Sequence, residues 1–122
     1  MTYNNSKEFD KELKGLLKKY RSLNEDIETF KRYAIETYFS DNHVDTDAFV
    51  KIEGLCNEDF TSYKVRKFAC KSLKNKGNRS GIRIIFIKDN KSENITFLEI
   101  YYKGDKEVED RGRIERFLYK NA

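Results

Sequence analysis

Apolar residues recur with a helical period in two stretches near the start of the chain. Residues 7–20 carry one apolar stripe at i, i+4, i+7, i+8 and i+11, with charged residues on the opposite face: Phe9, Leu13, Leu16, Leu17 and Tyr20. Ser22 and Glu25 then have the spacing of a capping box, which predicts the start of a second helix. Its inner face would carry Ile27, Phe30 and Ala34. The short connection between the two helices predicts an antiparallel helical hairpin.

The pattern is lost between residues 40 and 60. This segment begins with the polar, acidic sequence DNHVDTD, and only scattered apolar residues follow. We therefore predict a connector here. His43, the only histidine, has no motif around it and is interpreted as a solvated residue. Cys56 has no basic residue nearby to activate it, which favours a small buried side chain over a nucleophile.

From residue 61 the period becomes two, which is typical of β-strands. A first strand alternates between two faces, and a connecting loop with glycines leads to the isoleucine-rich segment 82–88, which suits a buried central strand. A third strand covers residues 95–102. The tight turn between these last two strands and the loop before them predict consecutive antiparallel strands. On the first strand, Tyr63, Val65, Lys67 and Ala69 would face one way and Lys64, Arg66, Phe68 and Cys70 the other.

A final helix is predicted over residues 110–119, where Ile114, Phe117 and Leu118 would be buried. The fold class is therefore α+β, as a single domain over residues 1–122. We expect an antiparallel sheet of three main strands, with room for a fourth at the N-terminus. The helical hairpin would pack on one face, the C-terminal helix would follow the sheet, and the other sheet face would be open as a platform.

Composition limits the classes of protein that need to be considered. The 122 residues are 38% hydrophobic and 14% aromatic, which is enough for one core. No apolar run approaches the ~18 residues that span a bilayer, and the polar N-terminus does not resemble a secretory signal, so we expect a cytoplasmic protein without membrane contact. Two separated cysteines and one histidine are too few ligands for a zinc site, so neither a metal nor another cofactor is expected.

Charge is segregated along the chain. The stretch Tyr63 to Phe86 contains eight basic residues and no Asp or Glu, which leaves 17 basic and 21 acidic residues elsewhere. The stretch is therefore +8 and the remainder −4. Like charges gathered in one place repel each other, whereas a binding site for a polyanion needs them. This asymmetry predicts that the two strands and their loop contact a phosphate backbone.

Strand parity predicts which of the cations converge. Lys64 and Arg66 would share a face of the first strand, and Arg83 is the only charged residue in the first half of the central strand. Tyr101 and Lys103 share a parity in the third strand, with Glu99 before them. In a meander of three strands these side chains would form one cluster of cations with a phenol.

Such a cluster suits phosphate chemistry. Arginine offers a planar fork for bidentate hydrogen bonding, and lysine offers a compact charge. In RNA cleavage without a metal, a 2′-hydroxyl attacks the adjacent phosphate, and cations stabilise the dianionic pentacoordinate species. A tyrosine or lysine with a pKa lowered by neighbouring cations would serve as the base. Charge alone does not separate this activity from simple nucleic-acid binding or from a solvated basic face.

The same residues resemble a known family. The segments YKVR at 63–66, KSLKNKGNRSG at 71–81, IRIIF at 82–86 and FLEIYYK at 97–103, followed by the acidic DKEVED, are similar to the RelE/ParE toxin superfamily and within it to its HigB-like branch. The resemblance extends over nearly the whole chain. It implies a RelE-like fold and the toxin of a type II toxin–antitoxin system.

Toxins of this kind commonly enter the A site of the 30S ribosomal subunit and cut mRNA there without a metal. The resemblance therefore implies an endoribonuclease (an mRNA interferase) that inhibits translation. Its partners would be the ribosome, mRNA and a cognate helix-turn-helix antitoxin, with operator DNA contacted only through that antitoxin.

The resemblance also assigns roles to residues. Lys64 and Arg66 match the basic pair of the first core strand, Arg83 matches the arginine after the glycine-containing loop, and Tyr101 and Lys103 match the end of the third strand. Arg66 and Arg83 would stabilise the phosphate. Tyr101 or Lys103 would be the base, with Tyr102 as an alternative phenol. The remaining cations would hold the RNA backbone: Lys67, Lys71, Lys74, Lys76 and Arg79.

Two other functions stay open at this point. One fold can host several activities, so a ParE-like inhibitor of DNA gyrase is an alternative to the endoribonuclease. The third possibility is a non-catalytic RNA- or DNA-binding protein of the same fold. The basic central strands favour the endoribonuclease, because gyrase inhibition has no need of a phosphate-stabilising cluster.

Overall fold

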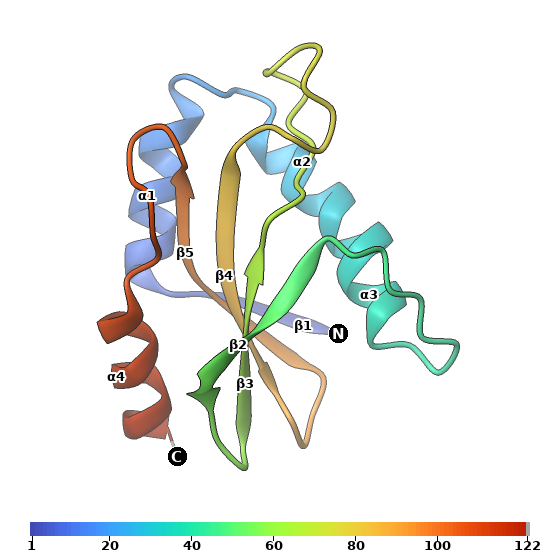
Figure 1. The fold of residues 1–122 in the computed structure, drawn as a ribbon, viewed down its shortest axis with the longest axis vertical. Coiled ribbons are helices and arrows are strands. Elements are labelled where there is room, and N and C mark those ends of the chain that lie inside the picture. Colours follow the sequence, from blue (N-terminus) through green and yellow to red (C-terminus); the bar gives the residue numbers. More distant parts are fainter. Residues whose placement is uncertain (122) are drawn as a thin grey trace.

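The structure, a computed structural model that describes residues 1–121, is a five-stranded mixed sheet with helices on both faces (Figure 1). The strands lie in the order β1-β5-β4-β3-β2. The α+β class and the three consecutive antiparallel strands β3, β4 and β5 are as predicted. The strands are β1 (Thr2–Asn5), β2 (Phe49–Cys56), β3 (Phe60–Val65), β4 (Ile82–Asp89) and β5 (Asn94–Tyr102), and the helical elements are α1 (Lys7–Leu17), α2 (Leu23–Phe30), η1 (Lys31–Ile35), α3 (Glu36–Tyr38) and α4 (Arg111–Asn121).

The predicted helical hairpin is present, with different ends. The Ser6 hydroxyl caps α1 by accepting a hydrogen bond from the Phe9 amide at 3.1 Å. The second helix runs as α2, a π-helical turn η1 and α3 in succession. The capping box predicted at Ser22 is wrong, because the Ser22 hydroxyl donates to Asp26 at 2.6 Å instead. Within residues 1–121, no helix is long and apolar enough to cross a membrane.

Both edges of the sheet differ from the prediction. The additional strand that was considered at the N-terminus is present as β1. It pairs with β5 in parallel, so the sheet is mixed and not purely antiparallel. The other edge is β2, which lies inside the segment that we interpreted as a connector. Its buried residues are Phe49, Ile52 and Leu55, a spacing of three that conceals a strand. The cause is an irregularity in register after Lys51 that includes Gly54 at φ +82°.

The predicted alternation along β3 stops at Val65. The amides of Arg66 and Lys67 both donate to the Ala48 carbonyl, at 2.9 and 3.1 Å. Two consecutive residues opposite one partner are a bulge, which shifts the parity of the chain that follows. Phe68 and Cys70 are therefore buried in the same core as Val65, on the opposite face from the one that parity predicted.

A second bulge lies in β5. Ile85 pairs with Glu99 and Phe86 pairs with Phe97, so Leu98 is the additional residue. Phe97 and Ile100 consequently face one core, whereas Leu98 faces the other. The sequence predicts a regular alternation with Ile95, Phe97, Glu99 and Tyr101 on one face, and this is wrong: the bulge places Glu99 and Tyr101 on the opposite face from Ile95 and Phe97.

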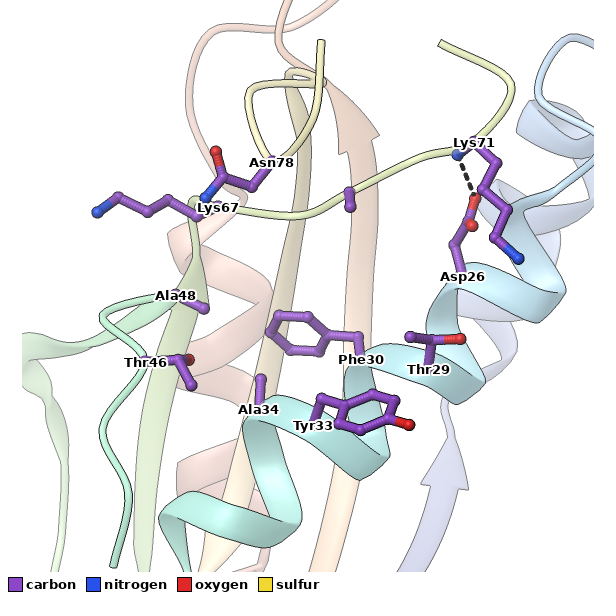
Figure 2. Close-up of a pocket in the computed structure, with 11 residues that line it drawn as sticks. Asp26, Thr29, Phe30, Tyr33, Ala34, Thr46, Ala48, Lys67, Lys71 and Asn78 are labelled. Carbon is purple, nitrogen blue, oxygen red and sulfur yellow. Dashed lines mark hydrogen bonds between the residues drawn. The ribbon is translucent and has the colours of Figure 1, made fainter. Parts of the chain in front are cut away.

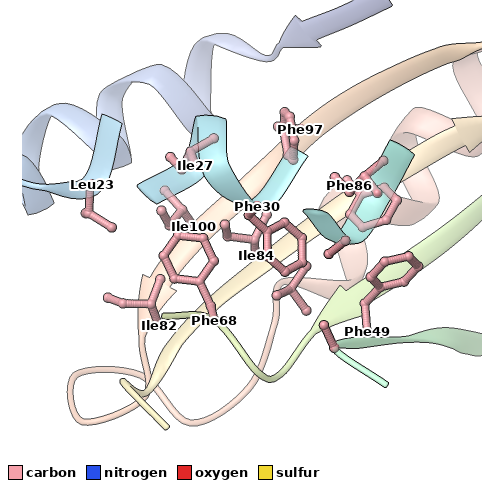
Figure 3. Close-up of a cluster of buried hydrophobic side chains, with 14 of the residues drawn as sticks. Leu23, Ile27, Phe30, Phe49, Phe68, Ile82, Ile84, Phe86, Phe97 and Ile100 are labelled. Atoms are coloured by element: carbon pink, nitrogen blue, oxygen red, sulfur yellow. The ribbon is translucent and has the colours of Figure 1, made fainter. Parts of the chain in front are cut away.

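The sheet has a core on each face. The larger core lies under α1 and α2 and includes the residues labelled in Figure 3. The smaller core contains Ile85, Ile87 and Leu98 of the sheet and Ile114 of α4. The prediction of an open second face is therefore wrong over this region, since α4 covers it. Arg113 ties α4 to the sheet and to α1 by donating to the Leu98 carbonyl at 2.8 Å and to Glu12 at 2.9 Å.

Two glycines give a matched test of the packing. A Cβ at Gly104 would lie 2.4 Å from the Tyr102 ring, which packs on Tyr20 with 5.8 Å between ring centroids. We expect Gly104→Ala to lower the free energy of unfolding by ~1–3 kcal/mol, because the ring has to move. Gly15 lies in α1, and a Cβ there would have nothing within 4 Å. Gly15→Ala should therefore raise the free energy of unfolding by ~0.5–1 kcal/mol. Urea unfolding measures both, and equal effects of the two substitutions would contradict this packing.

Candidate functional site

Three of the five residues predicted to carry the chemistry lie together on the α4 face of the sheet. Arg83 of β4 pairs directly with Tyr101 of β5. Lys64 of β3 pairs with Ile85, two residues after Arg83 and on the same face. Side chains that share a face on adjacent strands are neighbours. The register therefore places Lys64, Arg83 and Tyr101 in one cluster at the end of the sheet where β4 begins.

Arg83 is held by the backbone and not by an acid. Its guanidinium donates to the Arg66 carbonyl at 2.7 Å, and Arg83 forms no ion pair within residues 1–121. Arg66 follows the end of β3 in the bulge, and it is exposed and likewise free of ion pairs within the described chain. An anchored guanidinium keeps its remaining N–H groups for a ligand.

Lys64 already has a partner. Its ammonium lies 2.8 Å from a carboxylate oxygen of Glu109, whose side chain is only 9% exposed. Burial acts to raise the pKa of the Glu109 carboxyl, but the hydrogen bond and charge of Lys64, with the charge of Arg111, hold this pKa below its ordinary value. The acidic segment before α4 therefore reaches into the basic cluster.

Glu99 fixes this acidic segment in place. The side chain is 1% exposed, and it accepts a hydrogen bond from the Asp110 amide at 2.8 Å and forms a short ion pair with Lys106. Sequence reasoning did not assign roles to Glu109 or Lys106. The available signals were an acid within an otherwise apolar strand and the acidic run DKEVED that follows it.

Tyr101 differs from the expected base. It is 6% exposed, and its hydroxyl is buried without a hydrogen-bond partner in the described part of the chain. Burial, together with the charges of Glu109 and Glu99, raises the pKa of Tyr101 to about 12, although Arg83 acts in the opposite direction. The expectation of a phenol with a lowered pKa is therefore wrong for Tyr101. The Lys106 ammonium lies 5.4 Å from the centre of its ring.

Lys103 and Tyr102, the two other candidates for the base, lie on different parts of the surface at this end of β5. Lys103 is exposed in the turn after β5, and its amide donates to the Gly81 carbonyl at 2.8 Å. Tyr102 packs on the opposite face of the sheet, against Tyr20. The structure therefore separates Tyr102, the alternative phenol, from the cluster of Lys64, Arg83 and Tyr101.

The loop cations fall into two groups. Lys67 pairs with Asp47 at 2.7 Å and Lys71 with Glu25 at 2.5 Å, and all four of these side chains are more than 40% exposed. The remaining three are exposed and form no ion pair within residues 1–121: Lys74, Lys76 and Arg79. The loop is also attached to α2, since the Ser72 and Lys71 amides donate to Ser22 at 2.8 Å and Asp26 at 3.2 Å.

This arrangement provides cations for phosphate groups at two places, the face with Arg83 and Lys64 and the exposed loop. Guanidinium and ammonium groups form the strong, charge-assisted hydrogen bonds that phosphate oxygens accept. Residues 1–121 contain no group of three or more His, Cys, Asp or Glu side chains placed to hold a metal ion.

The pair of Lys64 and Glu109 can be tested by its pH dependence. We expect Glu109→Gln to lower the free energy of unfolding at pH 7 by ~1–3 kcal/mol, because a charged hydrogen bond is lost. A carboxyl whose pKa is lowered by folding stabilises the protein above its unfolded pKa of ~4.3, and this contribution is lost as the pH falls through the folded pKa. The difference between the two proteins should therefore shrink on acidification in urea unfolding experiments.

Glu107→Gln is the matched control for this prediction. Glu107 is an exposed acid in the same segment and has no ion pair within the described residues. Its substitution should change stability by less than ~0.5 kcal/mol at either pH. A loss in Glu109→Gln that stayed constant on acidification would contradict a stabilising Lys64–Glu109 pair.

Comparison with known proteins adds one structural similarity. No protein family and no curated protein matches the chain. A chain of the crystal structure of the archaeal RelE–RelB complex from Pyrococcus horikoshii OT3 aligns over 84% of this chain and 94% of its own length, with 18% sequence identity and a TM-score of 0.49.

Proposed function

We propose that this protein is the toxin of a type II toxin–antitoxin system and acts as a ribosome-dependent endoribonuclease on mRNA. The observation that carries the proposal is the anchored guanidinium of Arg83. It lies beside Lys64 on one sheet face and has no acidic partner within the described residues. The resemblance of the segments 63–66, 71–81, 82–86 and 97–103 to RelE/ParE toxins supplies the biological setting.

The proposed reaction breaks one bond and forms one. The 2′-hydroxyl oxygen of a ribose bonds to the adjacent phosphorus and loses its proton to a base, while the bond to the 5′-oxygen breaks and that oxygen takes up a proton. The products are a 2′,3′-cyclic phosphate and a 5′-hydroxyl. Negative charge accumulates on the phosphoryl oxygens in the transition state, where Arg83 and Arg66 would stabilise it.

The base is assigned to Lys103 in this proposal. Tyr101 is 6% exposed and its pKa is raised to about 12, so it is a poor proton acceptor near neutral pH. Lys103 is exposed in the turn that follows β5, where a ribose hydroxyl can approach it. Lys64 would then contribute its charge to the substrate in exchange for Glu109.

The loop would bind RNA outside the scissile phosphate. Lys74, Lys76 and Arg79 are exposed and unpaired within residues 1–121, so their charges are available to a polyanion. Lys67 and Lys71 have partners only in exposed ion pairs, which contribute little and are readily exchanged. Ribosomal RNA is the proposed ligand of Lys74, Lys76 and Arg79, and a cognate antitoxin is the proposed inhibitor.

Arginine substitutions test the proposed activity. We expect Arg83→Ala and Arg66→Ala each to lower the rate of mRNA cleavage by ~100-fold or more, the usual effect of removing one donor to a transition-state oxyanion. The measurement is primer extension on a message translated in the presence of the protein. Arg116→Ala, an exposed arginine of α4 away from the cluster, should cleave like the wild type.

Primer extension, combined with an assay of DNA gyrase and a measurement of RNA binding, separates the alternatives. An intact message together with stalled DNA gyrase would replace the proposal with a gyrase inhibitor. A message that is bound but never cut would leave a non-catalytic RNA-binding protein.

Tyr101→Phe tests the assignment of the base. We expect cleavage within about twofold of the wild type, because the hydroxyl is buried and does not accept the proton. The substitution removes a buried, unpartnered hydroxyl, so stability should be unchanged or rise by up to ~1 kcal/mol. A large loss of cleavage in a protein that remains folded would return the catalytic role to Tyr101.

A further inference from the structure

A pocket lies on the opposite face of the sheet from Arg83, where α2 and η1 meet the loop after β3. Its volume is ~290 Å³, and residues from three separate segments line it (Figure 2). Phe30 belongs to α2 and Tyr33 to η1, Ala48 immediately precedes β2, and Ala69 and Asn78 belong to the loop between β3 and β4. Pockets that bind drug-sized ligands have volumes of ~300–1,000 Å³, so this pocket has room for one small group.

The interior of the pocket is apolar and aromatic. Phe30 is 8% exposed and lies under the segment between Lys67 and Lys71 in Figure 2, while Tyr33 is 64% exposed. The Arg32 guanidinium lies 5.8 Å from the centre of the Tyr33 ring, and Tyr33 remains largely exposed. An exposed aromatic ring next to an apolar pocket is a surface on which a flat ring can stack.

The rim of the pocket is cationic. Lys67 and Lys71 lie on opposite sides of it in Figure 2, and Lys74, Lys76 and Arg79 follow in the same loop. Lys67 and Lys71 form exposed ion pairs with Asp47 and Glu25, of the kind that contributes little to stability and is readily exchanged. Asp26 is the acid in the lining, and it is 4% exposed and already accepts hydrogen bonds from Ser22 and the Lys71 amide.

Asn78 adds a group that can recognise polar edges. Its side chain lines the pocket and forms no hydrogen bond within residues 1–121, although its backbone carbonyl accepts from the Phe68 amide at 3.0 Å. A free carboxamide presents both a donor and an acceptor. Aromatic rings, surrounding cations and one amide are the combination that binds single-stranded nucleic acid.

The pocket is connected to the Arg83 cluster by two consecutive residues. Lys67 lines the pocket, and the carbonyl of the preceding Arg66 accepts the hydrogen bond from Arg83. An RNA strand that crosses the end of the sheet at this bulge would therefore meet the guanidinium on one face and the aromatic pocket on the other.

We propose that this pocket binds one unstacked nucleobase of the RNA strand, with the base on Tyr33 and the flanking phosphates at Lys67 and Lys71. The identification of the strand as RNA rests on the proposed function. Binding of the base follows from the aromatic floor, cationic rim and free amide described here. An apolar side chain of a partner protein also has the size of the pocket, but it would leave the cations and Asn78 without ligands.

Two exposed tyrosines provide a matched pair of variants. We expect Tyr33→Ala to weaken binding of a fluorescein-labelled, single-stranded RNA octamer by about tenfold, which corresponds to ~1.4 kcal/mol and lies within the range for stacking of one base. Tyr119, on α4, is 90% exposed and away from the pocket. Tyr119→Ala should bind the octamer like the wild type in the same fluorescence anisotropy titration.

An abasic octamer distinguishes stacking from charge. It carries the phosphates without the bases, so its affinity should be the same for wild type and Tyr33→Ala. Ala69→Leu, which fills the opening without changing charge, should reproduce the loss on the RNA octamer, and a thermal melt confirms that each variant is folded. An equal effect of Tyr33→Ala on both octamers, or none on either, overturns the proposal. The proposal is also overturned if Ala69→Leu binds the RNA octamer like the wild type but no longer binds a partner protein.

The result is independent of the test of cleavage. Tyr33→Ala should raise the RNA concentration needed for half-maximal cleavage and leave the rate at saturation unchanged, whereas Arg83→Ala lowers that rate. If the protein never cuts RNA but its octamer affinity depends on Tyr33, the pocket assignment stands and the enzymatic proposal fails. If the protein cuts RNA and neither binding nor cleavage depends on Tyr33, the enzymatic proposal stands and the pocket assignment fails.

Discussion

The structure around the site depends on the burial of one carboxylate. Glu99 lies on β5 with 1% of its surface exposed, and a buried charge is tolerated only when it is paired and hydrogen-bonded. Lys106 and the Asp110 amide meet this requirement. Because both partners come from the segment between β5 and α4, satisfying Glu99 also sets the path of that segment and the start of α4.

This constraint determines how much of the basic cluster is available. The segment held by Glu99 places Glu109 against Lys64, so an anion that approaches Lys64 meets a carboxylate already in position. Arg83 escapes the same neutralisation because its hydrogen bond goes to a neutral backbone carbonyl. The charge excess that is evident in the sequence therefore acts mainly through Arg83, Arg66 and the loop. Tyr101, between Arg83 and the acids, is left buried and neutral.

The sequence predicted regular elements well and irregular ones poorly. Period-two and helical patterns identified β3, β4, β5 and the main helices, because each buries one continuous apolar face. β2 was missed because its bulge at Gly54 spaces buried residues by three. For the site, parity correctly placed Lys64, Arg83 and Tyr101 together, since no bulge lies between them and their partners. Parity failed beyond Val65 and within β5 at Leu98, where bulges reverse the faces. It also had no means to foresee Glu109 as a partner from a distant segment.

The bulge at Arg66 and Lys67 is the feature that relates the two halves of the proposed RNA surface. Regular pairing would have placed these residues on alternate faces of a longer β3 and Phe68 away from the core of Val65. Instead both amides share the Ala48 carbonyl, the strand ends, and Phe68 returns to the core under α2. The Arg66 carbonyl is thereby turned to Arg83, while Lys67 reaches the pocket beside Phe30. This bulge thus joins the proposed phosphate-binding face to the aromatic pocket, as a single RNA strand that crosses the end of the sheet would require.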